Sequence, residues 1–250
     1  MTNTVAVDRF VSERESQEGE QFWSDFTGRG IGVIKGHETI TESALRATGL
    51  TAHRALLIEG VQRPDRAPSL PPGEQKRHAL RGLPCQTTAS ALAEIHAQLL
   101  KLHGLALAAR GGRDTWLWAG EALHLIQDSY SPAHTERALG GANPIIYIRS
   151  YRHGVLVGTT EHLYPVDHRD YIKFPSSKAW VARALSVSEE YLKLAKSHLA
   201  RRLSPAAARP DLVRFMNRHL ALSPAHRNPS DFHKACRKSA TAPSSGRTRP

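Results

Sequence analysis

Apolar positions in the middle of the chain recur at steps of three and four, which is the period of an amphipathic helix. Over residues 86–110 the recurring positions are Leu92, Ile95, Leu99, Leu102 and Ala106. Gly111 and Gly112 follow this stretch, and two consecutive glycines predict that the helix ends there. A long helix is also predicted from about Lys178 to Arg202, with Pro205 beyond its end.

Two further helices are predicted from the residues at their boundaries. Asp114 is suited to be the N-cap of a helix through WLWAGEALHLIQ, and Pro132 predicts where that helix stops. A shorter helix is predicted over ITESALRATGL, ending near Gly49.

The other segments do not have a helical pattern. Prolines interrupt residues 61–84 too often for a long helix, so we expect a structured loop or a linker there. The β-branched and aromatic residues of 145–172 predict a hairpin or another extended excursion. The sequence has no internal repeat. The predicted fold class is therefore all-α, a single multi-helix domain.

The net charge changes this picture at the C-terminal end. The chain has 250 residues and a formal net charge of +11. From Lys196 to Pro250 there are twelve Lys and Arg against two Asp, a net charge of +10, which leaves residues 1–195 at +1. We therefore expect a folded domain over residues 1–222 and a basic, disordered tail over 223–250. Such a tail either increases solubility or attracts nucleic acid or anionic lipid without specificity.

The sequence also limits the compartment and the kind of metal ligand. No stretch approaches the ~18 to 20 apolar residues of a membrane span, and the first residues lack the apolar core of a secretory signal. We expect no integral membrane segment, and a protein that is cytoplasmic as synthesised or is exported by a route without a signal. The two cysteines, Cys85 and Cys236, form no CxxC pair. A bound metal would therefore be held by histidine and carboxylate.

One short segment has the spacing of a metal site. His124 and Asp128 lie four residues apart in GEALHLIQDSYSPAH, so on a helix they share a face and could close on one ion. Pro132 should end the helix soon afterwards and let His134 turn back toward the same point. This segment therefore offers three candidate ligands.

The segment resembles the motif of the zinc-dependent phospholipases C, whose fold is shared with the zinc-dependent single-strand nucleases. The string HxxQDxxxPxH fixes five positions in eleven residues, here His124, Gln127, Asp128, Pro132 and His134. Upstream, GHETITESAL looks like the family's first histidine segment, with His37. GVQRPD and KRHAL resemble its Asp and His pair, Asp65 and His78. The resembling segments follow the family's order over about residues 30–172.

This resemblance implies an all-helical domain that binds two to three zinc ions (Zn2+). The first zinc would be held by four side chains, those of Asp65, His78, His124 and Asp128. Asp128 would bridge to a second zinc that His37 also binds. His134 would hold the third zinc.

The chain departs from the family pattern at two places. The family completes the third zinc site with a His and an acid spaced four apart, whereas TTEHLYPVDHRD offers His162 and Asp167, with further candidates His153, His168 and Asp170. The family also uses an N-terminal tryptophan as a ligand. Trp23 lies fourteen residues before His37 and would need cleavage of the chain just before it.

The resemblance implies a hydrolase that acts on glycerophospholipids at a membrane surface and releases diacylglycerol and a phosphorylated head group. Asp65 and Asp128 are the implied catalytic residues, Asp65 as a ligand that also orients or deprotonates the attacking water and Asp128 as the bridging ligand. One alternative is a single-strand nuclease whose basic C-terminal region tracks phosphates. Another is a metal-binding module without turnover.

Some further residues have a weaker interpretation. Gln127 and Glu121 could hold ligand imidazoles, although solvation at the surface is the expected role of Glu121. At least one of Trp116 and Trp118 is expected in the core. Seven other histidines are interpreted as solvated or hydrogen-bonded side chains: His53, His96, His103, His198, His219, His226 and His233.

Overall fold

The structure is a computed structural model that describes residues 36–66, 72–82, 86–131, 134–139, 143–149 and 175–228. In these ranges the chain forms six α-helices and one two-stranded sheet, so it is mainly helical, as the apolar periodicity predicts. The α-helices are α2 (Gly36–Thr48), α3 (Arg54–Gln62), α4 (Thr88–Ala108), α5 (Arg113–Asp128), α7 (Pro175–Ala200) and α8 (Pro205–His219). The strands are β1 (Thr135–Arg137) and β2 (Ile145–Ile148), and the 3₁₀ helices are η1 (Thr51–His53), η2 (Pro64–Arg66) and η3 (Pro72–His78).

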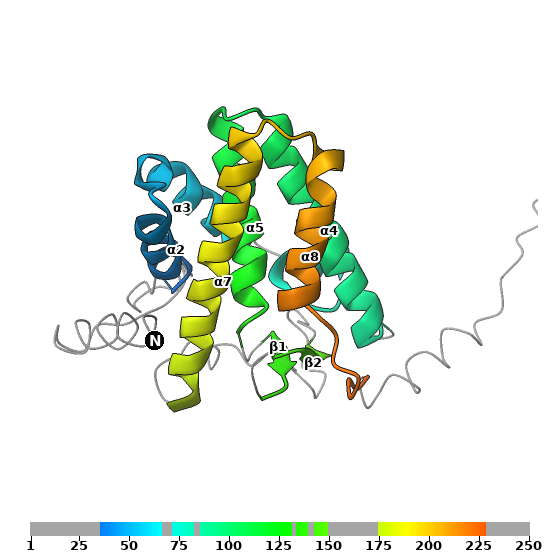
Figure 1. The fold of residues 1–250 in the computed structure, drawn as a ribbon. Coiled ribbons are helices and arrows are strands. Elements are labelled where there is room, and N and C mark those ends of the chain that lie inside the picture. Colours follow the sequence, from blue (N-terminus) through cyan, green and yellow to red (C-terminus); the bar gives the residue numbers. More distant parts are fainter. Residues whose placement is uncertain are drawn as a thin grey trace, which may run out of the picture.

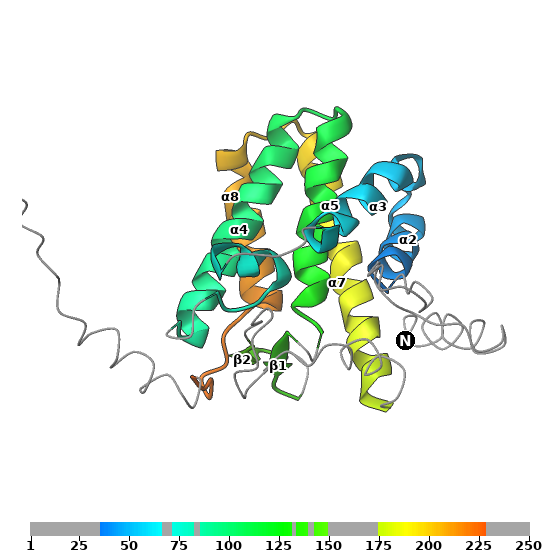
Figure 2. The same ribbon diagram turned by 180° about the vertical axis from the view of Figure 1, so that it is seen from behind.

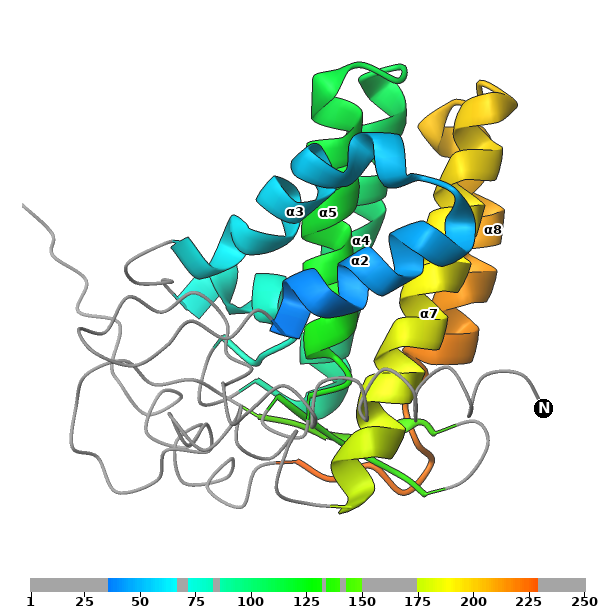
Figure 3. The same cartoon turned by 90° about the vertical axis from the view of Figure 1, so that its left-hand side faces the viewer.

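Helix α5 is the centre of the domain. It packs against α3, α4 and α7, and every residue from Thr115 to Asp128 except Trp118 is buried. Helices α4, α5, α7 and α8 stand together as an upright bundle (Figure 1). Helices α2 and α3 cross one side of this bundle obliquely (Figure 3), and the view from behind shows the strands at one end of it (Figure 2). Side chains on α5 are thereby shielded from solvent on several sides.

The predicted helix ends agree with the backbone at two glycines. Gly49 and Gly111 have φ angles of +67° and +84°, and glycine adopts such left-handed angles without a steric penalty. The prediction that Asp114 caps α5 is wrong. Gly112 is the N-cap, since its backbone is extended and the helix begins at Arg113, so Asp114 lies inside the first turn.

Two helices were not predicted from the sequence. Helix α3 lies just before the proline-rich region and is short. Helix α8 begins at Pro205, the residue interpreted as lying beyond a helix end. Proline suits the first position of a helix because the amide there has no intrahelical acceptor. The Ser204 hydroxyl accepts a hydrogen bond from the Ala207 amide and caps α8.

The start of the segment predicted as extended is strand β2. It pairs antiparallel with β1, which lies before that segment in the chain, and residues 150–174 are outside the described residues. The Arg149 amide donates to the His134 carbonyl, and the Arg81 amide donates to the Arg149 carbonyl, both at 2.8 Å. This small sheet therefore joins the chain around His134 to the chain just after η3.

Contacts of the described chain continue past residue 222, the expected end of the folded domain. The Arg227 amide donates to the Ile146 carbonyl at 3.0 Å, and the Thr88 hydroxyl donates to the Arg227 carbonyl at 2.7 Å. Residues 223–228 thus lie between β2 and the start of α4. Residues 229–250 are outside the described residues. Among the helices that are described, none has the combined length and apolar character needed to cross a bilayer.

A chain of hydrogen bonds connects α4, α7 and α8. His103 Nδ1 lies 3.3 Å from the Tyr191 hydroxyl, and His103 Nε2 lies 3.0 Å from His198 Nδ1. His198 Nε2 in turn lies 3.1 Å from Asp211 Oδ2. These contacts are satisfied when both rings are neutral and each donates through Nε2. A proton added to the buried His103 would displace the hydrogen bond from Tyr191.

We expect the free energy of unfolding of the metal-free protein to fall as the pH drops from 6.5 toward 4. Burial, reinforced by the neighbouring His198, lowers the pKa of His103 to about 4 from its ordinary value of 6.5. The unfolded chain takes up this proton first, so protonation costs up to about 3 kcal/mol of stability across that window. Urea unfolding of the wild type and of His103→Gln measures the effect. Equal pH slopes for the two proteins would contradict it.

Candidate metal centre

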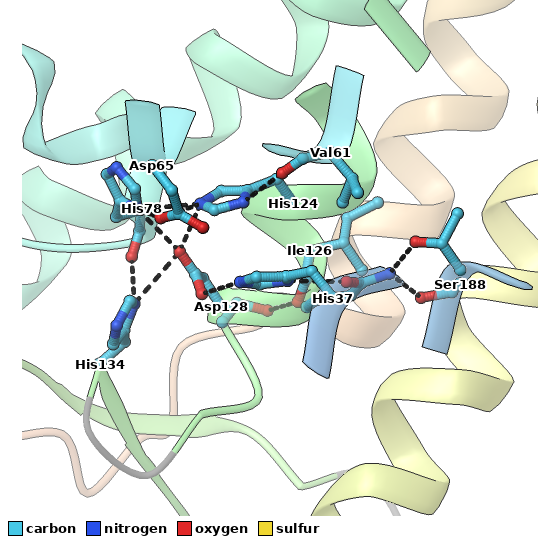
Figure 4. Close-up of polar contacts among 12 residues, drawn as sticks. His37, Val61, Asp65, His78, His124, Ile126, Asp128, His134 and Ser188 are labelled. Atoms are coloured by element: carbon cyan, nitrogen blue, oxygen red, sulfur yellow. Dashed lines mark hydrogen bonds and ion pairs between the residues drawn. The ribbon is translucent and has the colours of Figure 1, made fainter. Parts of the chain in front are cut away.

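The centre is built on one turn of α5, which carries His124 and Asp128 on the same face (Figure 4). Both residues are buried, and the side chain of His124 is 0% exposed. His124 Nδ1 lies 2.8 Å from the carbonyl oxygen of Val61 at the end of α3. A carbonyl only accepts hydrogen bonds, so Nδ1 of the ring carries a proton, and Nε2 is the nitrogen that faces Asp128 at 2.9 Å.

Four neighbouring side chains are called here the metal cage: Asp65, His78, His124 and Asp128. His78 Nδ1 and His124 Nε2 lie 2.9 Å apart, and Asp128 Oδ2 lies 3.0 and 2.9 Å from them. Asp65 Oδ1 lies 3.7 Å from His78 Nδ1 and 3.8 Å from His124 Nε2. Ligands about 2.0 to 2.1 Å from a tetrahedral ion are about 3.3 Å from one another. The separations from His78 and His124 are therefore close to those of ligands around one small cation.

The two carboxylate oxygens of Asp128 face different partners. Oδ2 faces the imidazoles of the metal cage, whereas Oδ1 lies 3.2 Å from His37 Nε2. His37 also forms a second close group with Asp65 and His124, and their ligand atoms lie within 4.8 Å of one another. Asp128 is thus placed to bridge two neighbouring cation positions.

Gln127 holds the ring of His37, as the sequence predicted. His37 Nδ1 lies 2.8 Å from Gln127 Oε1, so a proton on Nδ1 is donated there and Nε2 is directed toward Asp128. The Gln127 amide nitrogen donates in turn to Thr41 on α2 at 3.0 Å and to Ser188 on α7 at 3.4 Å. Three helices therefore fix the orientation of one imidazole.

The electrostatics of the centre favour positive charge. Burial alone would lower the pKa of His37, but the carboxylates of Asp128 and Asp65 outweigh burial and raise that pKa to about 9. Burial alone would raise the pKa of Asp128, yet the imidazoles of His124, His134 and His37 hold it well below its usual range. A proton on His37 therefore offsets part of the carboxylate charge in the metal-free protein, and a divalent cation could supply the same charge.

His134 lies beside the metal cage, immediately before β1. Its Nδ1 is 2.6 Å from the His78 carbonyl oxygen and 3.4 Å from Asp128 Oδ2. The structure therefore brings six of the expected site residues together: His37, Asp65, His78, His124, Asp128 and His134. The other expected ligands, His162 and Asp167, lie outside the described residues, as do Pro132, His153, His168, Asp170 and Trp23.

The environment of Glu121 differs from the expected surface solvation. Glu121 is buried, and its carboxylate pairs with Arg63 and Arg77 rather than with a ligand imidazole. A single glutamate on a helix gives no signal for partners 44 and 58 residues away, so the sequence could not predict this arrangement. The same is true of the Val61 carbonyl, a backbone group that every residue has.

The histidines interpreted as hydrogen-bonded side chains are away from the centre wherever they are described. His96 Nε2 lies 3.0 Å from the Leu220 carbonyl, and His219 Nε2 lies 2.8 Å from Glu190. His53 stacks on Trp116, with 4.0 Å between the ring centroids. Trp116 itself is buried, as expected for at least one of the two tryptophans.

The donor set is suited to a divalent metal ion, because imidazole nitrogens and carboxylate oxygens lie within 4.8 Å of one another in two groups. Comparisons of the chain with protein-family models, with curated proteins and with solved structures found no match. The arrangement of the donor atoms is therefore the basis for inferring a function.

Proposed function

We propose that the protein is a zinc-dependent phosphodiester hydrolase of the phospholipase C type, with two to three zinc ions in a fold of that family. The observation that carries the proposal is the metal cage, in which the imidazole nitrogens of His78 and His124 lie 2.9 Å apart and each lies 2.9 to 3.8 Å from a carboxylate oxygen of Asp128 and of Asp65. Convergence of such residues from separate segments is not required for packing. It is required for binding a metal ion.

Zinc is the proposed metal because of the donors and their spacing. Mixed imidazole and carboxylate donors at tetrahedral separations are typical of zinc sites that keep a position for a reactant. The His124 ring is oriented by a backbone carbonyl and the His37 ring by an amide oxygen. Such hydrogen bonds fix the ring tautomer and increase the basicity of a metal-ligating imidazole.

The proposed reaction is attack of water on phosphorus, with breakage of the bond to the glycerol oxygen, which leaves as the hydroxyl of diacylglycerol after taking a proton. Bound zinc supplies a Lewis acid that activates water near neutral pH and offsets the negative charge that develops on the phosphodiester. Asp65 is the most exposed member of the metal cage, with 23% of its side chain accessible. It is therefore the carboxylate best placed to orient and deprotonate a water molecule arriving from solvent.

A phospholipid substrate is preferred over a nucleic acid for two reasons. The sequence from Gln127 to His134 resembles the motif of the phospholipases more than that of the nucleases. In addition, residues 1–195 have a net charge of only +1. A strand of nucleic acid needs a positive groove. The second candidate is a single-strand nuclease, which the net charge of +10 over residues 196–250 favours.

We expect two to three equivalents of zinc per chain in protein purified without chelator. The motivation is the metal cage together with His37 on the second oxygen of Asp128 and His134 at 3.4 Å from the first. Elemental analysis after gel filtration measures the ratio. A folded and active protein that contains no metal would contradict the prediction.

A paired assay tests the activity. Zinc-loaded protein is incubated with phosphatidylcholine vesicles and with single-stranded DNA, each with and without a chelator. Release of diacylglycerol that the chelator abolishes supports the proposal. Cleavage of DNA alone would support the nuclease instead, and zinc binding without cleavage of either would indicate a binding module.

A further inference from the structure

Glu121 lies on α5 three residues before His124 and makes contacts that the proposed reaction does not use. Its side chain is 6% exposed. Its Oε2 lies 3.1 Å from Arg77 Nη2, and its Oε1 lies 3.5 Å from Arg63 Nη1. A buried carboxylate that pairs with two guanidinium groups is held firmly, because moving it away from them would leave its charge without compensation in a shielded place.

The two arginines stand next to two members of the metal cage. Arg63 is the C-cap of α3, two residues before Asp65, and Arg77 directly precedes His78 in η3. Asp65 belongs to η2, a 3₁₀ helix of three residues that is too short to fix a side chain by its own hydrogen bonds.

Each arginine has a second, weaker acidic partner close to it in sequence. Arg63 Nη2 lies 3.6 Å from Glu59, four residues earlier on α3, and Arg77 Nη1 lies 3.9 Å from Glu74 in the same 3₁₀ helix. The Glu74 pair lies within η3, and Glu59 also pairs with Arg113, the first residue of α5, at 3.0 Å. Glu121 differs because it joins both arginines to α5 one turn before His124.

We infer that Glu121 is a positioning residue that ties the segments supplying Asp65 and His78, through Arg63 and Arg77, to the helix that supplies His124 and Asp128. The inference rests on the proposed zinc site for its functional meaning. It identifies a group that sets the geometry of the metal cage without contacting the metal or the substrate.

The test compares Glu121→Gln with Glu74→Gln in the full chain. Both changes remove a carboxylate that pairs with Arg77, but only the first removes an ion pair between Arg77 and α5. We expect zinc affinity, measured by competition with a chelating dye, to fall by about 10- to 100-fold in Glu121→Gln and to stay near the wild-type value in Glu74→Gln. Equal affinities in the two variants would overturn the inference.

Amide hydrogen exchange in the metal-free protein gives a readout that does not depend on metal binding. We expect faster exchange in Glu121→Gln at residues 63–66 and 74–81, with α4 and α8 unchanged. A uniform increase over all helices would overturn the inference, since it would mean that Glu121 only adds global stability. If the wild type binds no zinc but the selective change is seen, the proposed function fails and the positioning role stands.

If Glu121→Gln does not fold, variants that each remove only one of the two ion pairs of Glu121 provide the test. Arg77→Gln should increase exchange at residues 74–81 and not at 63–66, and Arg63→Gln should do the reverse. Loss of protection in both segments from either single change, at the same level as in the rest of the chain, would contradict the two-armed arrangement.

Discussion

Replacing Asp128 by asparagine is expected to abolish phosphodiester hydrolysis while the helical circular-dichroism signal remains. Asparagine keeps the shape of the side chain but removes the charge, and only a carboxylate can serve two cations through two oxygens. Losing that ligand removes about 4 kcal/mol or more of the stabilisation that the metal ions give to the transition state. This corresponds to a drop in kcat/KM of about a thousandfold or more. The measurement is hydrolysis of phosphatidylcholine vesicles at saturating zinc, together with the far-ultraviolet spectrum.

Asp211→Asn is the matched control for this experiment. Asp211 also lies about a hydrogen-bond length from a histidine, at 3.1 Å from His198, but it belongs to α8 and has no contact with the metal cage. Activity close to that of the wild type is expected. If Asp128→Asn unfolds the protein, the metal ions are needed for folding stability rather than mainly for catalysis. If it retains full activity, the bridging role is wrong.

Replacing Gly120 by alanine is expected to lower the free energy of unfolding by about 3 kcal/mol, although alanine is the better helix former. A Cβ atom at this position would lie 2.5 Å from the Leu57 carbonyl oxygen and 2.8 Å from the Gly60 Cα atom. Both neighbours are backbone atoms, so no side-chain rotation relieves the clash and α3 must move away from α5. The end of α3 would then withdraw the Val61 carbonyl from His124, so zinc affinity should fall as well.

Gly104→Ala controls for the substitution itself. Gly104 is also in a helix, but its nearest neighbour to a new Cβ atom is Pro205 Cβ at 3.6 Å, which is an ordinary van der Waals contact. Here the higher helix propensity of alanine should leave stability unchanged or increase it by about 0.5 to 1 kcal/mol. Equilibrium urea unfolding of both variants measures the difference. Similar stability for the two would show that the close contact of α3 and α5 is not needed.

Much of the helical framework could be predicted because it depends on local pattern. The apolar residues of α4 recur with the helical period, and the glycines that follow α4 and α2 adopt the left-handed angles that end a helix. Helix α8 has a polar and proline-containing sequence, and its place in the fold depends on packing against α4 and α7. Tertiary contacts of this kind cannot be predicted from the apolar pattern within a single segment.

The ligands of the candidate site could also be predicted from the sequence, whereas the groups that orient them could not. His124 and Asp128 could be placed together from a spacing of four on one helix, and His37, Asp65 and His78 from the resemblance of their segments. The groups that orient them, such as the Val61 carbonyl and the carboxylate of Glu121, come from packing. Their roles were visible only once α3, η3 and α5 had been brought together.

The contact of Gln127 with Ser188 has a consequence for the order of folding. The six clustered residues are complete once residue 134 has been synthesised, but the amide that orients His37 also donates to a hydroxyl 61 residues after it. Ser188 belongs to α7, so this hydrogen bond cannot form until that helix has been synthesised. During translation, a chain arrested before α7 would hold the ligands without their final orientation, and stable metal capture would wait for synthesis of the C-terminal helices.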